Sequence, residues 1–216
     1  MMLKLYDFFR SSAAYRVRIA LRLKKLDYQH IPIHLTKDGG HQFTPSYRAV
    51  NAQARVPSLD VDGVILTQSL AIIEYLDETH PQPAFLPADA MGRARARAMA
   101  QLIACDIHPL NNLAPLTYLK DRMGQDEDAV KTWYRHWVET GLAALEALVT
   151  AQPRKGDFCM GERPGIADIC LVPQIFNARR YKSDLSGCPT LVKIDAACNA
   201  LPEFAAAAPD KQPDAT

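Results

Sequence analysis

The chain has 216 residues, enough for one large domain or two small ones with hydrophobic cores of their own. Hydrophobic residues make up 48% and charged residues 23%, which is ordinary globular usage and excludes a wholly disordered chain. The formal net charge of +1 gives no electrostatic reason to expect nucleic acid or an anionic membrane as a partner. No apolar run approaches the roughly 20 residues that span a bilayer.

The first 80 residues alternate between strand and helix patterns. Residues 1–25 carry seven Lys or Arg against one acid, Asp7, a bias that also occurs in mitochondrial transit peptides. Because LKLYDF is typical of a strand, we interpret this segment as part of the fold, with its arginines on the outer face of a helix. The expected elements are a strand at Leu3–Phe8, a helix at Arg16–Lys25, a strand over 31–35 that Pro32 assigns to a sheet edge, a hairpin over 56–66 that turns at Asp62-Gly63, and a helix at Gln68–Thr79.

The rest of the chain shows only helical patterns. The stretch His80–Asp89, HPQPAFLPAD, holds three prolines and is typical of a linker. Helices are expected over 90–123 with bends at its prolines, 126–151, 166–181 and 190–200, followed by a loose tail over 205–216. We therefore predict an α/β domain over 1–80, a linker over 81–89 and an all-helical domain over 90–216.

The five cysteines are scattered and odd in number, and no secretory signal pattern precedes them. This usage favours a reducing compartment, and we expect a cytoplasmic protein without a disulfide framework. The spacing Cys105-x-x-His108 resembles half of a metal site. Without a second pair it predicts two residues on one helix face, and we expect no metal.

Three short stretches indicate a binding site. Ser11-Ser12 lies where a strand enters a helix, so backbone N–H groups and hydroxyls at a positive helix end could hold an anion. No phosphate-loop motif is present, and the alternative is that Ser12 only caps the helix. Gln68-Ser69 is a second helix start that suits a carboxylate, or again a cap. At Val56-Pro57, a cis bond would turn the Val56 peptide groups outward to pair with an extended peptide; the alternative is a simple strand-start proline.

Several longer motifs resemble the zeta class of the glutathione transferases, in particular its maleylacetoacetate isomerases. They are SSAAYRVRIAL, KDGGHQF, RVPSL, QSLAIIEYLDETHP, CDIHPLNN, ADICLVPQIFNARRYKSDL and the terminal QPD, and they run in register from about residue 3 to about residue 214. The resemblance implies a thioredoxin-like α/β domain with a mixed four-stranded sheet, an all-α second domain, glutathione as cofactor and a homodimer.

The resemblance also assigns roles to individual residues. Ser11 would hydrogen-bond the glutathione sulfur with Ser12 beside it, and Arg180 would bind a substrate carboxylate. The remaining contacts to glutathione would come from Val56 beside a cis Pro57 (cysteinyl unit), Gln68 and Ser69 (γ-glutamyl unit), Gln42 (glycyl end), and His108 with Asn112 on one helix face (sulfur side). Alternatively, His108 and Asn112 are a polar pair in a helix interface and Arg180 is a surface cation. We interpret Asp168 as structural, in a capping box with Gly165.

The activity implied is the glutathione-dependent cis–trans isomerisation of a dicarboxylic enone, 4-maleylacetoacetate to 4-fumarylacetoacetate, in tyrosine and phenylalanine catabolism. A thiolate adds to the double bond, the resulting single bond rotates, and elimination returns the trans alkene. Many zeta-class proteins have cysteine where this chain has Ala13, which disfavours reductive dehalogenation. Maleylpyruvate isomerisation, general conjugation and a non-enzymatic interaction domain are the alternatives; the last predicts loss of the glutathione-site residues, which are all present.

Overall fold

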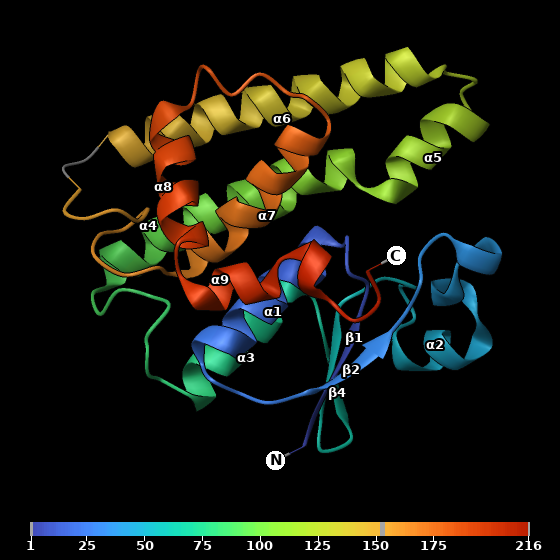
Figure 1. The fold of residues 1–216 in the computed structure, drawn as a ribbon, viewed down its shortest axis with the longest axis horizontal. Helices are drawn as coiled ribbons and strands as arrows, with labels where there is room; N and C mark the ends of the chain where they lie inside the picture. Colours follow the sequence, from blue (N-terminus) through green and yellow to red (C-terminus); the bar gives the residue numbers. More distant parts are fainter. Residues whose placement is uncertain (1, 152–153, 216) are drawn as a thin grey trace. The chain divides into compact units, whose positions relative to one another are not determined.

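The computed structural model describes residues 2–151 and 154–215. The chain forms two compact units, one of residues up to Ala84 together with those from Leu201 onward, and one of Phe85–Ala200 (Figure 1). Each unit is described by itself. Among the described residues, no helix combines the length and the apolar character that a membrane crossing requires.

The first unit is built on a mixed four-stranded sheet, as predicted. The strands are β1 (Leu3–Asp7), β2 (Gln29–Pro32), β3 (Ser58–Val61) and β4 (Val64–Thr67), in the order β2-β1-β3-β4. β1 and β2 are parallel, whereas β1–β3 and β3–β4 are antiparallel. Pro32 lies in an edge strand, where its missing N–H is tolerated. The β3–β4 turn has positive φ at both Asp62 (49°) and Gly63 (93°), the conformation that this dipeptide favours.

The alternation of β1 determines what covers each face of the sheet. Leu5 and Asp7 are buried on the face covered by α1 (Ser12–Leu23), and Tyr6 contacts Tyr47 of α2 (Pro45–Val50), which lies on the other face (Figure 1). α3 (Ser69–Thr79) packs beside α1. Two short 3-10 turns, Lys37–Gly39 and His41–Phe43, lead into α2, an element that the sequence pattern did not predict.

The arginines of α1 correct one prediction. Arg16 and Arg18 are 1% and 0% exposed instead of lying on an outer face. The cause is that α1 also packs against a C-terminal helix, α9 (Pro202–Ala207), so little of its surface remains open. The Arg18 guanidinium is compensated inside by the Asp7 carboxylate, 2.8 Å away.

The C-terminal segment corrects a second prediction, because it is neither loose nor part of the helical unit. Phe204 of α9 is fully buried in the first unit. After the turn Pro209–Lys211, Gln212 is buried and its amide donates to the carbonyls of Ala206 and Ala208. The expected domain boundaries therefore change: the first unit ends at Ala84 and resumes at Leu201, because these apolar and amide side chains are buried there.

The second unit contains only helices among its described residues. They are α4 (Ala90–Gln101), a π-helical segment (Leu102–Ile107), a 3-10 turn (His108–Asn111), α5 (Leu113–Asp121), α6 (Glu127–Thr150), α7 (Ile166–Arg180) and α8 (Pro189–Asn199). α7 is buried nearly all round. Its first turn has the predicted capping box, in which Asp168 accepts hydrogen bonds from the N–H groups of Gly165 and Cys159 at 2.8 Å each. Asp168 is therefore structural.

Candidate active site

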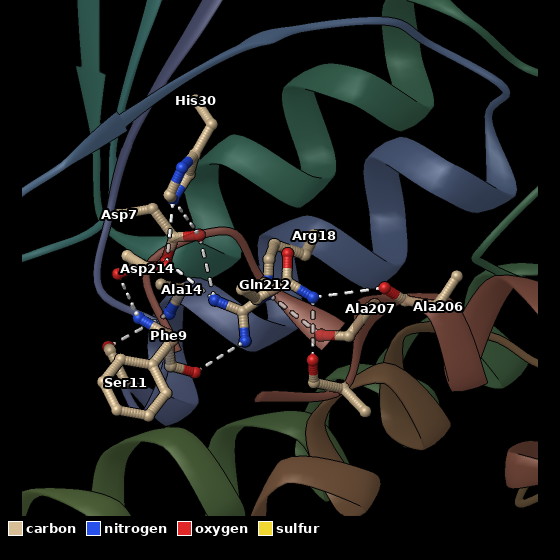
Figure 2. Close-up of polar contacts among 11 residues, drawn as sticks. Asp7, Phe9, Ser11, Ala14, Arg18, His30, Ala206, Ala207, Gln212 and Asp214 are labelled. Atoms are coloured by element: carbon tan, nitrogen blue, oxygen red, sulfur yellow. Dashed lines mark hydrogen bonds and ion pairs between the residues drawn. The ribbon is translucent and has the colours of Figure 1, made fainter. Parts of the chain in front are cut away.

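Ser11 is the N-cap of α1. Its hydroxyl oxygen accepts a hydrogen bond from the Ala14 N–H at 3.2 Å (Figure 2). Its own N–H donates to the Phe8 carbonyl at 2.8 Å. The cap is therefore Ser11, whereas Ser12 is the first helical residue and is buried. The Ser11 hydroxyl proton is still available to donate outward, since the bond to Ala14 uses only an oxygen lone pair. The first turn has no acidic residue, so the positive end of the helix is not neutralised there.

Val56 lies in a loop that is held firmly on one side. The peptide bond to Pro57 is cis, as anticipated for this motif. The preceding Arg55 carbonyl accepts hydrogen bonds from the Tyr47 hydroxyl (2.7 Å) and the Asn51 amide (2.8 Å). Within residues 2–151 and 154–215, neither the N–H nor the C=O of Val56 has a hydrogen-bond partner. The loop thus presents one residue, Val56, whose backbone donor and backbone acceptor are both unused among the described residues.

The Val56 loop and the Ser11 turn meet in the core. The side chain of Val56 is buried in a cluster with Phe8, Phe9 and Tyr47. Because Phe8 and Phe9 directly precede the turn that carries Ser11, this cluster fixes the two segments relative to each other. The first unit therefore brings together two of the features that the sequence analysis selected.

Gln68 and Ser69 form the start of α3. Gln68 has φ 69° and ψ 115°, a conformation that non-glycine residues rarely adopt, and its side chain does not cap the helix. Instead its amide nitrogen donates to the Gln53 side-chain oxygen at 2.9 Å. The Ser69 hydroxyl is buried and accepts from Arg16 of α1 at 3.3 Å. As with Ser11, the hydroxyl accepts from its own chain and still has its proton to donate.

Among the polar residues predicted for the site that do not lie at the start of α1 or α3, Gln42 is the least exposed. It is 4% exposed, its amide nitrogen donates to the Leu35 carbonyl at 3.1 Å, and its side chain packs over Gly40. Among the described residues, its amide oxygen has no hydrogen-bond partner. The carboxamide is therefore folded into its own loop, with one N–H still available.

In the second unit, His108 and Asn112 do not share a regular helix, which corrects the prediction that they lie on one helix face. The His108 N–H donates to the Ile103 carbonyl five residues back, the π-helical pattern. His108 then begins a 3-10 turn, and Asn112 is the N-cap of α5, where its side-chain oxygen accepts from the Leu113 N–H at 2.7 Å. A π-helical turn is wider and a 3-10 turn is tighter than an α-helical turn. The prediction assumed α-helical spacing, in which residues i and i+4 lie on one face, and this spacing is not kept here.

Arg180 and its neighbour Arg179 differ in their partners. Arg179 pairs with the buried carboxylate of Asp195 at 2.5 Å. Arg180, the last residue of α7, is exposed, and its guanidinium lies 5.3 Å from the ring centroid of Tyr181. Tyr181 is in turn stacked on Tyr134. In the part of the chain that the structure describes, no carboxylate pairs with Arg180.

A charged cluster behind the Ser11 turn was missed by the sequence analysis. Asp7 is fully buried between Arg18 and His30, whose Nε2 lies 3.3 Å from the carboxylate (Figure 2). Burial acts to raise the pKa of Asp7, but His30 and Arg18 outweigh it and the pKa lies below its ordinary value. The same contact with Asp7 raises the pKa of His30, in spite of its burial. An aspartate inside an apolar strand, and the terminal QPD, were the signals in the sequence.

The comparisons with known proteins cover the whole chain. Residues 5–84 match the model of the glutathione S-transferase N-terminal domain, and residues 131–206 match that of the C-terminal domain. The maleylacetoacetate isomerase of Pseudomonas aeruginosa is 49% identical over 98% of both chains. This chain belongs to the glutathione S-transferase family.

Three solved structures are similar to this chain over its whole fold, and the first of them is a zeta-class member. The holo structure of a bacterial maleylpyruvate isomerase, a zeta-class member, has a TM-score of 0.96 with 45% identity and covers 99% of this chain and 100% of its own. The maleylacetoacetate isomerase of Anaeromyxobacter dehalogenans is similar with glutathione bound in its active site (TM-score 0.88, 42% identity, 100% and 98% covered). It is also similar with dicarboxyethyl glutathione and citrate bound (TM-score 0.86, 41% identity, 100% and 98% covered).

Proposed function

We propose that this chain is a glutathione-dependent cis–trans isomerase that converts 4-maleylacetoacetate to 4-fumarylacetoacetate in tyrosine and phenylalanine catabolism. The observation that carries the proposal is the shared arrangement of Ser11 and Ser69. Each hydroxyl lies at a helix N-terminus without an acidic first turn, and each accepts from its own chain. Two hydroxyl protons and two positive helix ends in one unit suit a molecule with a thiolate and a carboxylate.

The first unit suits the remaining parts of glutathione as well. The unused N–H and C=O of Val56 match those of the cysteinyl residue in an extended peptide. Gln68 and Ser69 would hold the γ-glutamyl end, and Gln42 would contact the glycyl end through its second N–H. Glutathione, when bound, supplies the thiolate that adds reversibly to the maleyl double bond, so that the bond can rotate.

The protein's own residues have two tasks in this reaction. The end of α1 and the Ser11 hydroxyl favour the thiolate over the thiol, whose ordinary pKa is about 8.5. Ser12 lies beside Ser11 at the same helix end, and His108 and Asn112 would contribute polar groups on the sulfur side. Arg180 would bind a terminal carboxylate of the substrate and orient the double bond.

The different partners of Arg179 and Arg180 support the assignment of the substrate carboxylate to Arg180. Arg179 already has Asp195 as its partner. Of the two guanidinium groups, only that of Arg180 is without a carboxylate partner in the described part of the chain. We expect Arg180→Ala to raise KM for the dicarboxylic substrate about tenfold or more without lowering the melting temperature. Arg179→Ala is the matched control: it leaves Asp195 buried without its partner, and we expect a lower melting temperature with kcat/KM retained. The reverse result would reassign the carboxylate contact.

Maleylpyruvate is the second candidate substrate, because a maleylpyruvate isomerase has the TM-score of 0.96. It is a shorter acid that undergoes the same reaction. Comparing kcat/KM for the two acids decides between them, and the proposal expects the higher value with maleylacetoacetate. A general conjugating activity would instead consume one glutathione for each molecule of substrate.

Two further properties belong to the proposal, the oligomeric state and the location in the cell. We propose a homodimer, which the family implies. We also propose a cytoplasmic location, because all five cysteines, each within the described residues, are thiols and not disulfide partners.

A further inference from the structure

The C-terminal segment Gln212–Ala215 contacts the turn that carries Ser11. The Phe9 N–H donates to a carboxylate oxygen of Asp214 at 3.0 Å, and the Phe9 carbonyl accepts from Arg18 at 2.9 Å (Figure 2). Both peptide groups of one residue are therefore held by charged side chains. Charge-assisted hydrogen bonds of this kind are roughly twice as strong as neutral ones.

The two charged partners of Phe9 are connected to each other. The second oxygen of Asp214 lies 3.5 Å from His30 Nε2, and His30 Nε2 lies 3.3 Å from Asp7. Asp7 in turn accepts two hydrogen bonds from Arg18, at 2.8 and 2.9 Å. The contacts close a ring around the Phe9 peptide that joins β1, α1, β2 and the C-terminal segment. We call this arrangement the charged ring; its members are Asp7, Arg18, His30, Asp214 and the Phe9 peptide.

The same segment contacts the other backbone feature of the site. Ala215 packs against the cluster that contains Phe8, Phe9 and Val56. The segment is itself fixed, because Gln212 is 6% exposed and its amide nitrogen donates to the carbonyls of Ala206 and Ala208 at the end of α9. One short stretch at the end of the chain thus contacts both the Ser11 turn and the Val56 loop.

We propose that Asp214 is a positioning residue of the glutathione site, which acts by fixing the Phe9 peptide and through it the Ser11 hydroxyl. This inference rests on the proposed function, since it takes Ser11 as the thiolate contact. Phe9 lies two residues before Ser11, and the Ser11 N–H donates to the Phe8 carbonyl. A displacement of the Phe9 peptide therefore also displaces Ser11. A small displacement of a positioned donor is enough to weaken its effect on a bound anion.

The test uses two variants of Asp214 and one matched control. Asp214→Asn retains the shape and one acceptor but removes the charge, whereas Asp214→Ala removes both. Asp210→Asn makes the same chemical change four residues earlier, where the side chain is 69% exposed and pairs only with Lys211 among the described residues. Three quantities are measured: the Kd of glutathione by calorimetry, the pKa of the bound thiol by thiolate absorbance, and amide hydrogen exchange at Phe9 in the free protein.

We expect Asp214→Asn to weaken glutathione binding about threefold and Asp214→Ala about tenfold, each with a raised thiol pKa and faster exchange at Phe9. Asp210→Asn should match the wild type in all three quantities. A role in stability alone would lower the folded fraction but leave the Kd and the thiol pKa of the folded protein unchanged, and that result would overturn the proposal. If Asp214→Ala does not fold, Asp214→Asn decides alone, and wild-type values for it count against the inference.

Failure of this inference can be told apart from failure of the proposed function. Wild-type protein that does not bind glutathione contradicts the proposed function, and this inference falls with it. Wild-type protein that binds glutathione, with both Asp214 variants equal to it, contradicts this inference only.

Discussion

At the scale of single residues, the decisive feature is how hydroxyl groups are used at helix starts. A serine that caps a helix accepts a backbone hydrogen bond, and a cap of this kind, expected at Ser12, was the alternative to a functional role for this turn. The structure shows that the two roles do not compete at Ser11, because the cap occupies an oxygen lone pair and the proton is not needed for it. The same holds for Ser69 and its contact from Arg16.

Substitutions of Ser11 separate the two roles. Ser11→Ala removes the cap and the hydroxyl, and we expect it to lower stability by about 1 kcal/mol and kcat/KM by roughly 100-fold. Ser11→Gly caps nearly as well, so its stability should fall by only a few tenths of a kcal/mol while kcat/KM falls as far as in Ser11→Ala. Urea unfolding and initial rates provide the two numbers. If Ser11→Gly keeps wild-type activity, the hydroxyl does not contact the sulfur.

The backbone of Gln68 offers a second test at this scale. Its positive φ of 69° is strained for any residue with a Cβ and relaxed for glycine. We expect Gln68→Gly to raise the free energy of unfolding by about 1 kcal/mol and to weaken glutathione binding, because the carboxamide is lost. Gln68→Ala is the control, since it loses the same carboxamide and keeps the strain. Equal stability of the two variants would show that the φ value is not strained here.

At the scale of elements, the strands and their order of appearance were predictable and the interruptions were not. The Asp62-Gly63 turn, the edge position of Pro32 and the helix at 69–79 follow from local chemistry that tertiary contacts do not override. The π-helical segment before His108 could not be predicted, because its residues show no periodic pattern that separates it from a regular α-helix. Arg18 is buried against α9, which lies nearly 190 residues away in sequence, and Arg16 donates to Ser69 of α3, so neither burial leaves a local trace in the sequence.

The charged ring predicts a pH dependence of stability. The groups that face His30 are Asp7, Asp214 and Arg18. Its contact with Asp7, helped by the charge of Asp214, raises the pKa of His30 above the ordinary 6.5 against the opposing effects of burial and of the Arg18 charge. A raised histidine pKa stabilises the folded state fully below about pH 6.5 and loses this contribution as the pH rises through the folded value. The melting temperature of the wild type should therefore exceed that of His30→Gln most at low pH, and the difference should shrink as the pH rises above about 6.5. A difference that grows with pH would contradict the contacts of His30.

At the scale of the whole molecule, the two-part organisation was predictable but its boundaries were not. The proline-rich stretch indicated the change from α/β to helical structure near residue 84. Residues 201–215 belong to the first unit because Phe204 and Gln212 are buried there. The alanine- and proline-rich composition of this stretch gave no indication of that burial. The candidate site also contains features that were predictable from the sequence and features that were not. The helix starts near Ser11 and Ser69 and the cis bond after Val56 follow from local backbone chemistry and were predictable, whereas the charged side chains behind Ser11 were missed.

The homodimer is a prediction at this scale. Light scattering coupled to size-exclusion chromatography should give twice the mass of one chain at micromolar concentration. Adding glutathione should leave that mass unchanged, because the proposed cofactor contacts in the first unit come from one chain. A mass of one chain at every concentration would contradict the dimer.

The central claim is that glutathione acts as a coenzyme and is not consumed. The most direct measurement follows the isomers of 4-maleylacetoacetate and the total free thiol in one reaction, with glutathione far below the substrate concentration. The proposed function predicts complete conversion to the trans isomer with the thiol concentration unchanged, and no enzyme-dependent conversion when glutathione is omitted. Conversion without glutathione, or the loss of one thiol for each product molecule, would contradict it.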